Sequence, residues 1–267
     1  MKQLLLALQF LTILPVRVKG EISETEVAKS SAFFVFAGLL QGIFLLILLS
    51  LGERFFHSEL TILIILFGMV MSNGGFHLDG LADTFDALAV KSTGDPDRDR
   101  EKRLSVMKDS ATGSIGVTSL IFAVMLKFFS MKNISHLNPS LFYSSVLLMP
   151  VVSKWTMTAA MFHGMAARDN GLGKLFIEGI TIRDFLLSTV ILFATYGLVP
   201  LIFRDLSGWF FFTVAMSVAL YTLTGLWLYL CNKIFGGSTG DTLGALSEIT
   251  EIAFLFMVII WSRLFIS

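Results

Sequence analysis

The sequence has a single cysteine, Cys231, and no excess of either charge. One thiol cannot form a disulfide within the chain, which excludes a disulfide-stabilised scaffold. Twenty Lys and Arg residues against twenty Asp and Glu residues give a formal net charge of zero. The chain as a whole therefore has no electrostatic attraction for nucleic acid. It also has no repeat and no soluble domain boundary, so residues 1–267 are predicted to form one domain.

Hydrophobic residues are abundant. They fill 55% of the 267 positions, whereas apolar residues and glycine together make up about half of an ordinary soluble domain. A membrane-spanning helix needs roughly 17–25 mostly apolar residues. Seven runs meet this requirement: 31–52, 60–76, 112–130, 141–163, 185–203, 208–230 and 242–264. We therefore predict an all-α fold, a polytopic integral membrane helical bundle with about seven transmembrane helices.

The opening segment, MKQLLLALQFLTILP, is apolar but too short to span a membrane, and Pro15 ends it. It resembles a signal peptide, yet the next residues are VRVKG, without the small residues of a cleavage site. We predict that the segment is retained as a short N-terminal helix, interfacial or re-entrant.

Lysine and arginine residues in the loops predict the orientation, because cytoplasmic loops are enriched in them. If the loop 77–111 is cytoplasmic, fourteen of the twenty basic residues fall inside, five fall outside, and Lys154 lies in a span. The five outside are Arg54, Lys127, Lys132, Arg204 and Arg263. The three most polar connections, 77–111, 164–184 and 231–241, then share one face. We expect the active site to face the cytoplasm.

Three aspartates recur in HLDGLADTFDAL, residues 77–88, where the chain leaves an apolar run. Residues spaced by four and three positions lie on one face of a helix, so Asp79, Asp83 and Asp86 form one carboxylate stripe. Such carboxylates repel one another unless a cation lies among them, and Mg²⁺ prefers carboxylate and phosphate oxygens. The stripe predicts a Mg²⁺ site; a solvated face is the alternative. His77 is a candidate base or a packed hydrogen-bonding residue.

A second acidic stripe lies in FGGSTGDTLGALSEITE, residues 235–251. Asp241 and Glu248 are seven residues apart and share a helix face, and Glu251 lies one turn deeper. An ionised acid within a bilayer usually faces the bundle interior or a wet cavity. These acids could bind metal or substrate, or form an internal pair with Lys154, which could equally face a phosphate.

Glycines precede this second stripe, in the segment GGSTGD. Backbone N–H groups at the start of a helix can bind a phosphate, although two glycines also simply turn a chain at a membrane edge. The candidate phosphate-binding residues are Gly237, Ser238, Thr239 and Gly240.

Basic residues occur in two further polar segments. The first half of 95–116 alternates in charge and is predicted to be a solvated loop. Its later part, RLSVMKDS, contains basic residues that could bind a diphosphate or nucleotide, or could only anchor the loop inside; the candidates are Arg103, Lys108 and Asp109. The segment 167–176, ARDNGLGKLF, allows the same interpretation less strongly for Arg168 and Lys174.

Four motifs resemble those of cobalamin synthases in the same order: HLDGLADTFDAL, EKRLSVMKDSATGSIGV, RDNGLGKLF and FGGSTGDTLGALSEITE. The early FLTILPV resembles the start of that family as well. The resemblance implies an integral enzyme of the bacterial or archaeal cytoplasmic membrane. Such an enzyme joins α-ribazole, or its 5′-phosphate, to adenosylcobinamide-GDP, releases GMP and needs Mg²⁺. The implied partners are these small molecules and the lipid bilayer, not nucleic acid, and a homo-oligomer is compatible with the sequence.

Phosphoryl transfer of this kind depends on positioning and on charge neutralisation by divalent metal. We expect one or two Mg²⁺ ions on Asp79, Asp83, Asp86 and Asp241. Asp83 or Asp86 would take the proton of the attacking ribose hydroxyl, with His77 as a further candidate. The candidate substrate-binding residues are Arg103, Lys108, Asp109, Lys154, Gly237, Ser238, Thr239, Gly240 and Glu248.

Two other functions remain as alternatives. A CDP-alcohol phosphotransferase also binds metal through an acidic helix. Its motif has an alanine at the position of Asp83 in DGLAD, followed by an arginine, and this chain has neither residue there. An ion-coupled transporter could use Glu248, Glu251 and Lys154 within the membrane. The sequence shows no paired inverted repeat, and its acids gather near one face.

Overall fold

The chain folds into a bundle of helices in the computed structural model, which describes residues 2–203, 206 and 208–265. The elements are α1 (Lys2–Leu11), α2 (Glu24–Lys29), the 3-10 helix η1 (Ser30–Phe33), α3 (Phe34–Phe55), α4 (Ser58–Ser72), α5 (Phe76–Leu88), α6 (Pro96–Val106), α7 (Ser114–Ser135), α8 (Pro139–His163), α9 (Leu172–Gly179), α10 (Ile182–Ile202), α11 (Trp209–Phe235) and α12 (Gly240–Phe265). Within these described ranges, the one β-type pairing is an isolated bridge between Ala166 and Ser238. The predicted all-α membrane bundle is confirmed.

Six segments are long and apolar enough to cross a membrane, and a seventh crossing depends on a bent pair of helices. The run 60–76 was expected to be one span. Instead α4 has 15 residues, a length of roughly 22 Å, which is short of a hydrocarbon core of about 30 Å. The chain then bends by 86° into α5. The bend turns the acidic stripe away from the direction of the apolar helix that precedes it.

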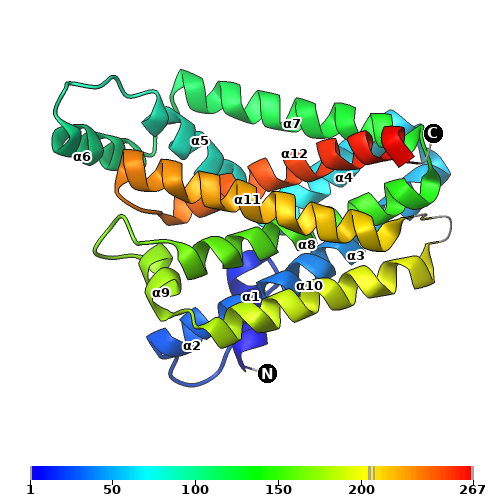
Figure 1. Ribbon diagram of the computed structural model, residues 1–267, viewed down its shortest axis with the longest axis horizontal. Helices are drawn as coiled ribbons and strands as arrows, with labels where there is room; N and C mark the ends of the chain where they lie inside the picture. Colours follow the sequence, from blue (N-terminus) through cyan, green and yellow to red (C-terminus); the bar gives the residue numbers. More distant parts are fainter. Residues whose placement is uncertain (1, 204–205, 207, 266–267) are drawn as a thin grey trace.

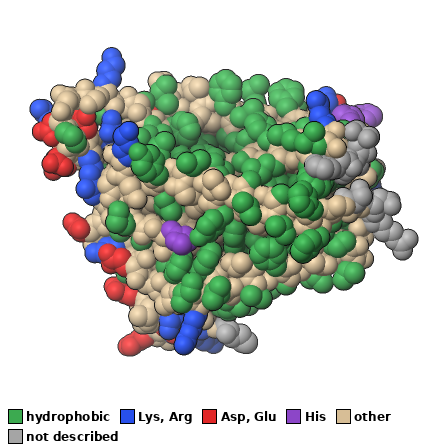
Figure 2. Space-filling model, in the orientation of Figure 1, with side chains coloured by type: hydrophobic (Ala, Val, Ile, Leu, Met, Phe, Trp, Pro, Cys, Tyr) green, Lys and Arg blue, Asp and Glu red, His purple; other side chains and the backbone are tan. Residues whose placement is uncertain are grey.

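The long helices run side by side, and the polar connections gather at one end of the bundle (Figure 1). That end contains the three connections that were predicted to share one face: 77–111 with α5 and α6, 164–184 with α9, and 231–241 between α11 and α12. The prediction of a solvated loop in the first half of 95–116 is wrong, because Pro96–Val106 form α6, which Asp95 caps. Charged side chains cluster there, while the face seen in Figure 2 is mostly hydrophobic elsewhere. One basic residue differs from expectation, because Lys127 lies buried within α7 and not in an outer loop. Arg204 is outside the described residues.

The predicted N-terminal helix is present as α1. It lies across the direction of the long helices (Figure 1) and packs against α2, η1 and α3. Its Phe10 ring contacts Phe34 and Phe176, with ring centroids 5.8 and 4.9 Å away. The segment is thus part of the packed bundle; its placement at a membrane interface stays a prediction.

Helix α8 is the centre of the bundle, because its residues from Ser144 to Met161 are all buried. Helix α3 approaches it closely through two glycines. A Cβ atom on Gly38 would lie 2.5 Å from the Pro150 carbonyl oxygen, and one on Gly42 would overlap the Leu147 carbonyl. Small residues allow membrane helices to pack backbone against backbone, which replaces the hydrophobic driving force that is missing between helices in lipid.

Replacing Gly42 by alanine should separate α3 from α8. Overpacking of a tight contact costs about 1–3 kcal/mol, so Gly42→Ala should lower the free energy of unfolding by that amount. Gly225→Ala is the matched control, because no atom lies within 4 Å of a Cβ at that helical glycine. Thermal unfolding in detergent compares the two variants. Equal midpoints would show that the contact does not hold the bundle together.

Candidate functional site

The acidic helix α5 crosses the start of α12 at a pair of glycines. Gly75, with a φ of 77°, ends the turn after α4. One turn into α5, a Cβ on Gly80 would lie 2.7 Å from the backbone oxygen of Asp241. From the other side, a Cβ on Gly244 would lie 3.4 Å from the Cα of His77. Only helices in backbone contact are this close, so the two acidic segments share one location.

Four predicted acids come together at this crossing. The charges of Asp79, Asp86 and Asp241 all act on the carboxyl group of Asp83. Asp79 is exposed, and the other three are partly buried. Arg168 adds a positive charge: its Nη2 lies 3.3 Å from Oδ2 of Asp241, and its charge also acts on Asp83. The group therefore combines an excess of negative charge with one guanidinium group.

Asp86 has a local partner that the sequence analysis missed. Its oxygens accept hydrogen bonds from the backbone N–H groups of Gly113 (2.6 Å) and Gly116 (2.8 Å). These amides belong to the start of α7, so Asp86 caps that helix. Both partners must be glycines, since a Cβ on either one would overlap the Asp86 carboxylate. The glycines of SATGSIG were the available signal.

A metal ion at the crossing would need oxygen atoms of the substrate to complete its coordination shell. In residues 2–203, 206 and 208–265, no three His, Cys, Asp or Glu side chains form a ready metal cluster. Asp86 is engaged by α7 and Asp241 by Arg168, whereas no donor within these ranges bonds the carboxylates of Asp79 and Asp83. Mg²⁺ is commonly held by one or two carboxylates, with waters and substrate phosphates completing its shell. The residues present fit that kind of site.

The glycine-rich segment before α12 offers fewer phosphate contacts than predicted. The Ser238 N–H donates to the carbonyl of Met165 (2.7 Å), and the Ser238 carbonyl accepts from Ala167 (3.0 Å). These bonds attach the glycine-rich segment to the loop that follows α8, and they occupy the backbone N–H of Ser238.

The next residues cap α12. Thr239 and Thr242 exchange hydrogen bonds, each hydroxyl accepting from the other's backbone N–H, at 3.2 and 2.8 Å. Amides of the first helical turn have no carbonyl partner within the helix. Those of Gly240 and Asp241 are therefore the two that remain for an anion.

The predicted basic residues lie in separate hollows on the surface. Arg103 lines one beside Asp99 and Asn232, and Lys108 lines another beside Arg168. Asp109 is exposed and accepts a hydrogen bond from the Ala111 N–H at 3.1 Å, which makes it a turn residue. The cation at the acids is Arg168, which the sequence analysis ranked below Arg103 and Lys108.

A buried ionic network lies deeper in the bundle. The Lys127 ammonium group bonds to the carboxylates of both Glu248 (2.6 Å) and Glu251. Ser153 also donates to Glu251, at 3.0 Å. The sequence offered Lys154 as one possible partner of these acids, and the structure places Lys127 there instead. Lys127 comes from α7, whose sequence contains no acid that would suggest a partner.

Lys154 and His77 extend this network toward α5. The Lys154 ammonium group bonds to the hydroxyls of Ser153 and Ser247, each at 3.3 Å, and lies 3.5 Å from Nδ1 of His77. His77 is fully buried, and Asn73 lies 3.2 Å from the same nitrogen. These side chains support α5 from within the bundle. None of them lines the cavity that contains Asp241.

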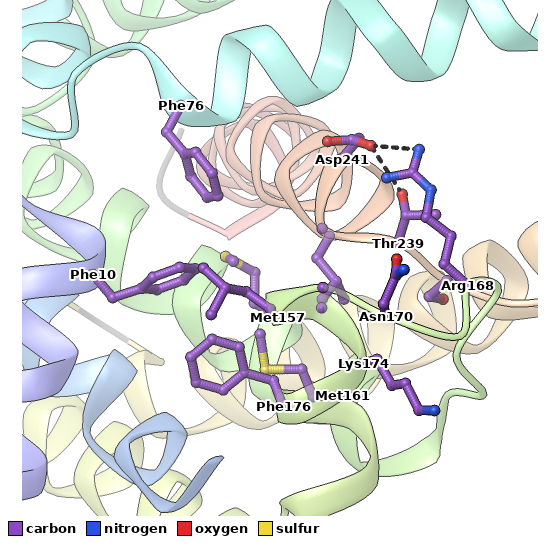
Figure 3. A pocket seen from close by; sticks show the side chains of 16 residues that line it. Phe10, Phe76, Met157, Met161, Arg168, Asn170, Lys174, Phe176, Thr239 and Asp241 are labelled. Atoms are coloured by element: carbon purple, nitrogen blue, oxygen red, sulfur yellow. Dashed lines mark hydrogen bonds and ion pairs between the residues drawn. The ribbon is translucent and has the colours of Figure 1, made fainter. Parts of the chain in front are cut away.

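That cavity has a volume of about 220 Å³. Figure 3 shows its two unlike ends. Arg168, Asn170, Thr239 and Asp241 lie at one end, and the rings of Phe10, Phe76 and Phe176 lie at the other with two methionines. Asp241 at the helix crossing thus opens onto a cavity that is charged on one side and aromatic on the other.

Removing the buried cation should destabilise the protein strongly. Breaking one partner of a buried ion pair costs about 3–5 kcal/mol, so Lys127→Met should lower the free energy of unfolding by that amount. Adding Glu248→Gln and Glu251→Gln should recover most of the loss. Lys132→Met on the same helix is the control, because its pair with Glu59 is exposed and should contribute little to stability. Denaturation in mixed micelles measures all three; equal losses at Lys127 and Lys132 would contradict the network's role.

Comparisons with known proteins cover nearly the whole chain. Residues 3–259 match the family model described as cobalamin-5-phosphate synthase. An adenosylcobinamide-GDP ribazoletransferase from Thermodesulfovibrio yellowstonii is 36% identical, over 98% of both chains. A protein of the same name from Caldanaerobacter subterraneus is 33% identical, and the match covers 97% of this chain and 99% of that protein. Another from Fusobacterium nucleatum is 30% identical over the full length of both chains. No solved structure matches the chain.

Proposed function

The chain belongs to the cobalamin-5-phosphate synthase family, and we propose that it is an adenosylcobinamide-GDP ribazoletransferase. In this reaction a ribose hydroxyl of α-ribazole, or of its 5′-phosphate, attacks the phosphorus that bears the cobinamide. The new P–O bond forms as the bond to GMP breaks, GMP leaves with the electron pair, and the hydroxyl proton passes to a base. The observation that carries this proposal is the α5–α12 crossing, which brings the carboxylates of α5 beside Asp241, and Asp241 lines the cavity.

The residues of the crossing have distinct roles in this proposal. Asp79 and Asp83 would hold the metal, together with Asp241 if its pair with Arg168 opens. Mg²⁺ supplies neutralisation of the diphosphate charge. Arg168 then offers its guanidinium group to the same diphosphate, for which it is suited by its fork of N–H donors. The amides of Gly240 and Asp241 face the anion from the start of α12.

Asp83 is the better candidate for the base. Sequence reasoning left Asp83 and Asp86 equal, but both oxygens of Asp86 already accept hydrogen bonds from α7. Asp83 is partly buried among the other acids and is not occupied in this way, so one of its oxygens can take the proton while the other faces the metal.

The membrane orientation follows the same proposal. The basic residues of the loops gather at the end where the acids lie, and cytoplasmic loops are enriched in such residues. We propose that this end faces the cytoplasm, across a bacterial or archaeal cytoplasmic membrane.

The direct test is an assay of the purified protein in detergent or nanodiscs. With adenosylcobinamide-GDP, α-ribazole 5′-phosphate and Mg²⁺, the protein should release one GMP for each cobalamin phosphate formed. Chelation by EDTA should abolish GMP release, and Mg²⁺ should restore it. GMP release without a new corrinoid product, or full activity in EDTA, would contradict the proposal.

Asp83→Asn and Asp241→Asn should each lower kcat by about 10²-fold or more, the usual contribution of a positioned base or a metal ligand. Asp97→Asn is the matched control, since Asp97 is exposed on α6 away from the crossing. Mn²⁺ binding, followed by electron paramagnetic resonance, should weaken in both site variants. Near-normal turnover in both would refute the metal role.

Asp86→Asn should behave differently. The amide can still accept one of the two hydrogen bonds from α7, so we expect a loss of about 1 kcal/mol in stability, as for a weakened helix cap. Turnover per folded molecule should fall less than tenfold. A loss as large as that of Asp83→Asn, with an unchanged melting temperature, would make Asp86 the base instead.

A further inference from the structure

The aromatic rings at the apolar end of the cavity come from three segments far apart in the sequence. Phe10 comes from α1, Phe76 from α5 and Phe176 from α9, and Met157 and Met161 of α8 close the space beside them (Figure 3). The site proposed above uses none of these residues. Their common feature is that they face the same cavity as Asp241.

The rings form an ordered cluster. The centroids of Phe10 and Phe176 are 4.9 Å apart with tilted planes, and those of Phe10 and Phe76 are 5.5 Å apart, edge to face. Phe34, behind them, is 5.2 Å from Phe176, also edge to face. Phe176 and Phe34 are buried, whereas Phe76 is 41% exposed. A ring entering the cavity would meet the partly exposed rings of Phe10 and Phe76, which Phe176 and Phe34 support from behind, an arrangement that favours planar aromatic ligands.

Size and polarity decide which part of the substrates fits. A corrin macrocycle is far larger than a cavity of about 220 Å³. Guanine has hydrogen-bonding groups along its edge, and against phenylalanine and methionine side chains these would lose their water without a partner, which disfavours binding. The base of α-ribazole is a benzimidazole, a bicyclic ring with an apolar outer edge. Its ribose is polar and would lie toward Arg168 and Asp241.

We propose that the aromatic end of the cavity, built by Phe10, Phe76 and Phe176, binds the benzimidazole-type base of the incoming nucleoside and directs its ribose hydroxyl toward the acids at the α5–α12 crossing. This inference rests on the proposed function. It also assigns a role to α1: the N-terminal helix carries one wall of a substrate site. When the nucleobase is bound in this way, the ribose hydroxyl is held near the diphosphate, and no residue beyond those of the crossing is needed to position it.

The test separates the two substrates. Phe10→Ala should raise KM for α-ribazole 5′-phosphate roughly 5- to 100-fold, the range that follows from losing one base-stacking side chain. KM for adenosylcobinamide-GDP should stay within about twofold. Phe76→Ala should act in the same direction. Phe210→Ala is the control, because that ring is 81% exposed on α11 and lines no cavity among those described.

A binding measurement keeps the result independent of turnover. Calorimetric titration with α-ribazole 5′-phosphate alone should show binding to the wild type that Phe10→Ala weakens, and titration with GMP should show no change in that variant. Phe10→Leu retains bulk in the packing and replaces Phe10→Ala if the latter does not fold. An equal rise of both KM values, weakened GMP binding, or unchanged ribazole binding would overturn the subsite.

The two proposals fail in different ways. If the wild type binds α-ribazole 5′-phosphate through Phe10 but releases no GMP, the proposed transferase function falls and the aromatic subsite stands. If it releases GMP while Phe10 and Phe76 variants keep a normal KM for the ribazole substrate, the function stands and the subsite is wrong.

Discussion

The contact of α5 with α12 at Gly80 is the constraint on which the site depends. A side chain at this position would meet the backbone of Asp241 at 2.7 Å, so only glycine lets the two helices touch. That contact places the carboxylates of α5 beside Asp241 and Arg168. The bend after α4 turns α5 into position, and the hydrogen bonds of Asp86 to the start of α7 hold its far end. Negative charge is thereby concentrated at the polar end of the bundle.

Beneath the crossing, the membrane interior is polar where an apolar core would be expected. Lys127 bonds to both Glu248 and Glu251, and Lys154 and His77 continue the network to the base of α5. A paired charge in a bundle interior is tolerable, whereas an unpaired one is strongly unfavourable. This closed pairing also argues against the transporter alternative, because an ion path needs acids that can release their partner.

Local patterns predicted the helices and the acidic stripe, because both depend on periodicity within one segment. The spacing of Asp79, Asp83 and Asp86 required only that 77–88 be helical, and it is. Partners across helices were less predictable. Lys127 looked like a loop residue and proved to be buried opposite Glu248, and Asp86 looked like a metal ligand and caps α7. Such pairings depend on how the helices pack against one another, and the residue pattern within a single segment does not reveal that packing. Arg168, Phe10 and Phe176 reach the cavity by the same long-range packing.

The central claim is that carboxylates from α5 and from the start of α12 hold one divalent ion between them. Anomalous scattering from crystals grown with Mn²⁺ and adenosylcobinamide-GDP locates that ion directly. We expect a peak between the side chains of Asp79, Asp83 and Asp241, in contact with diphosphate oxygens. A peak confined to the exposed acids of α6, with none at the crossing, would contradict the account.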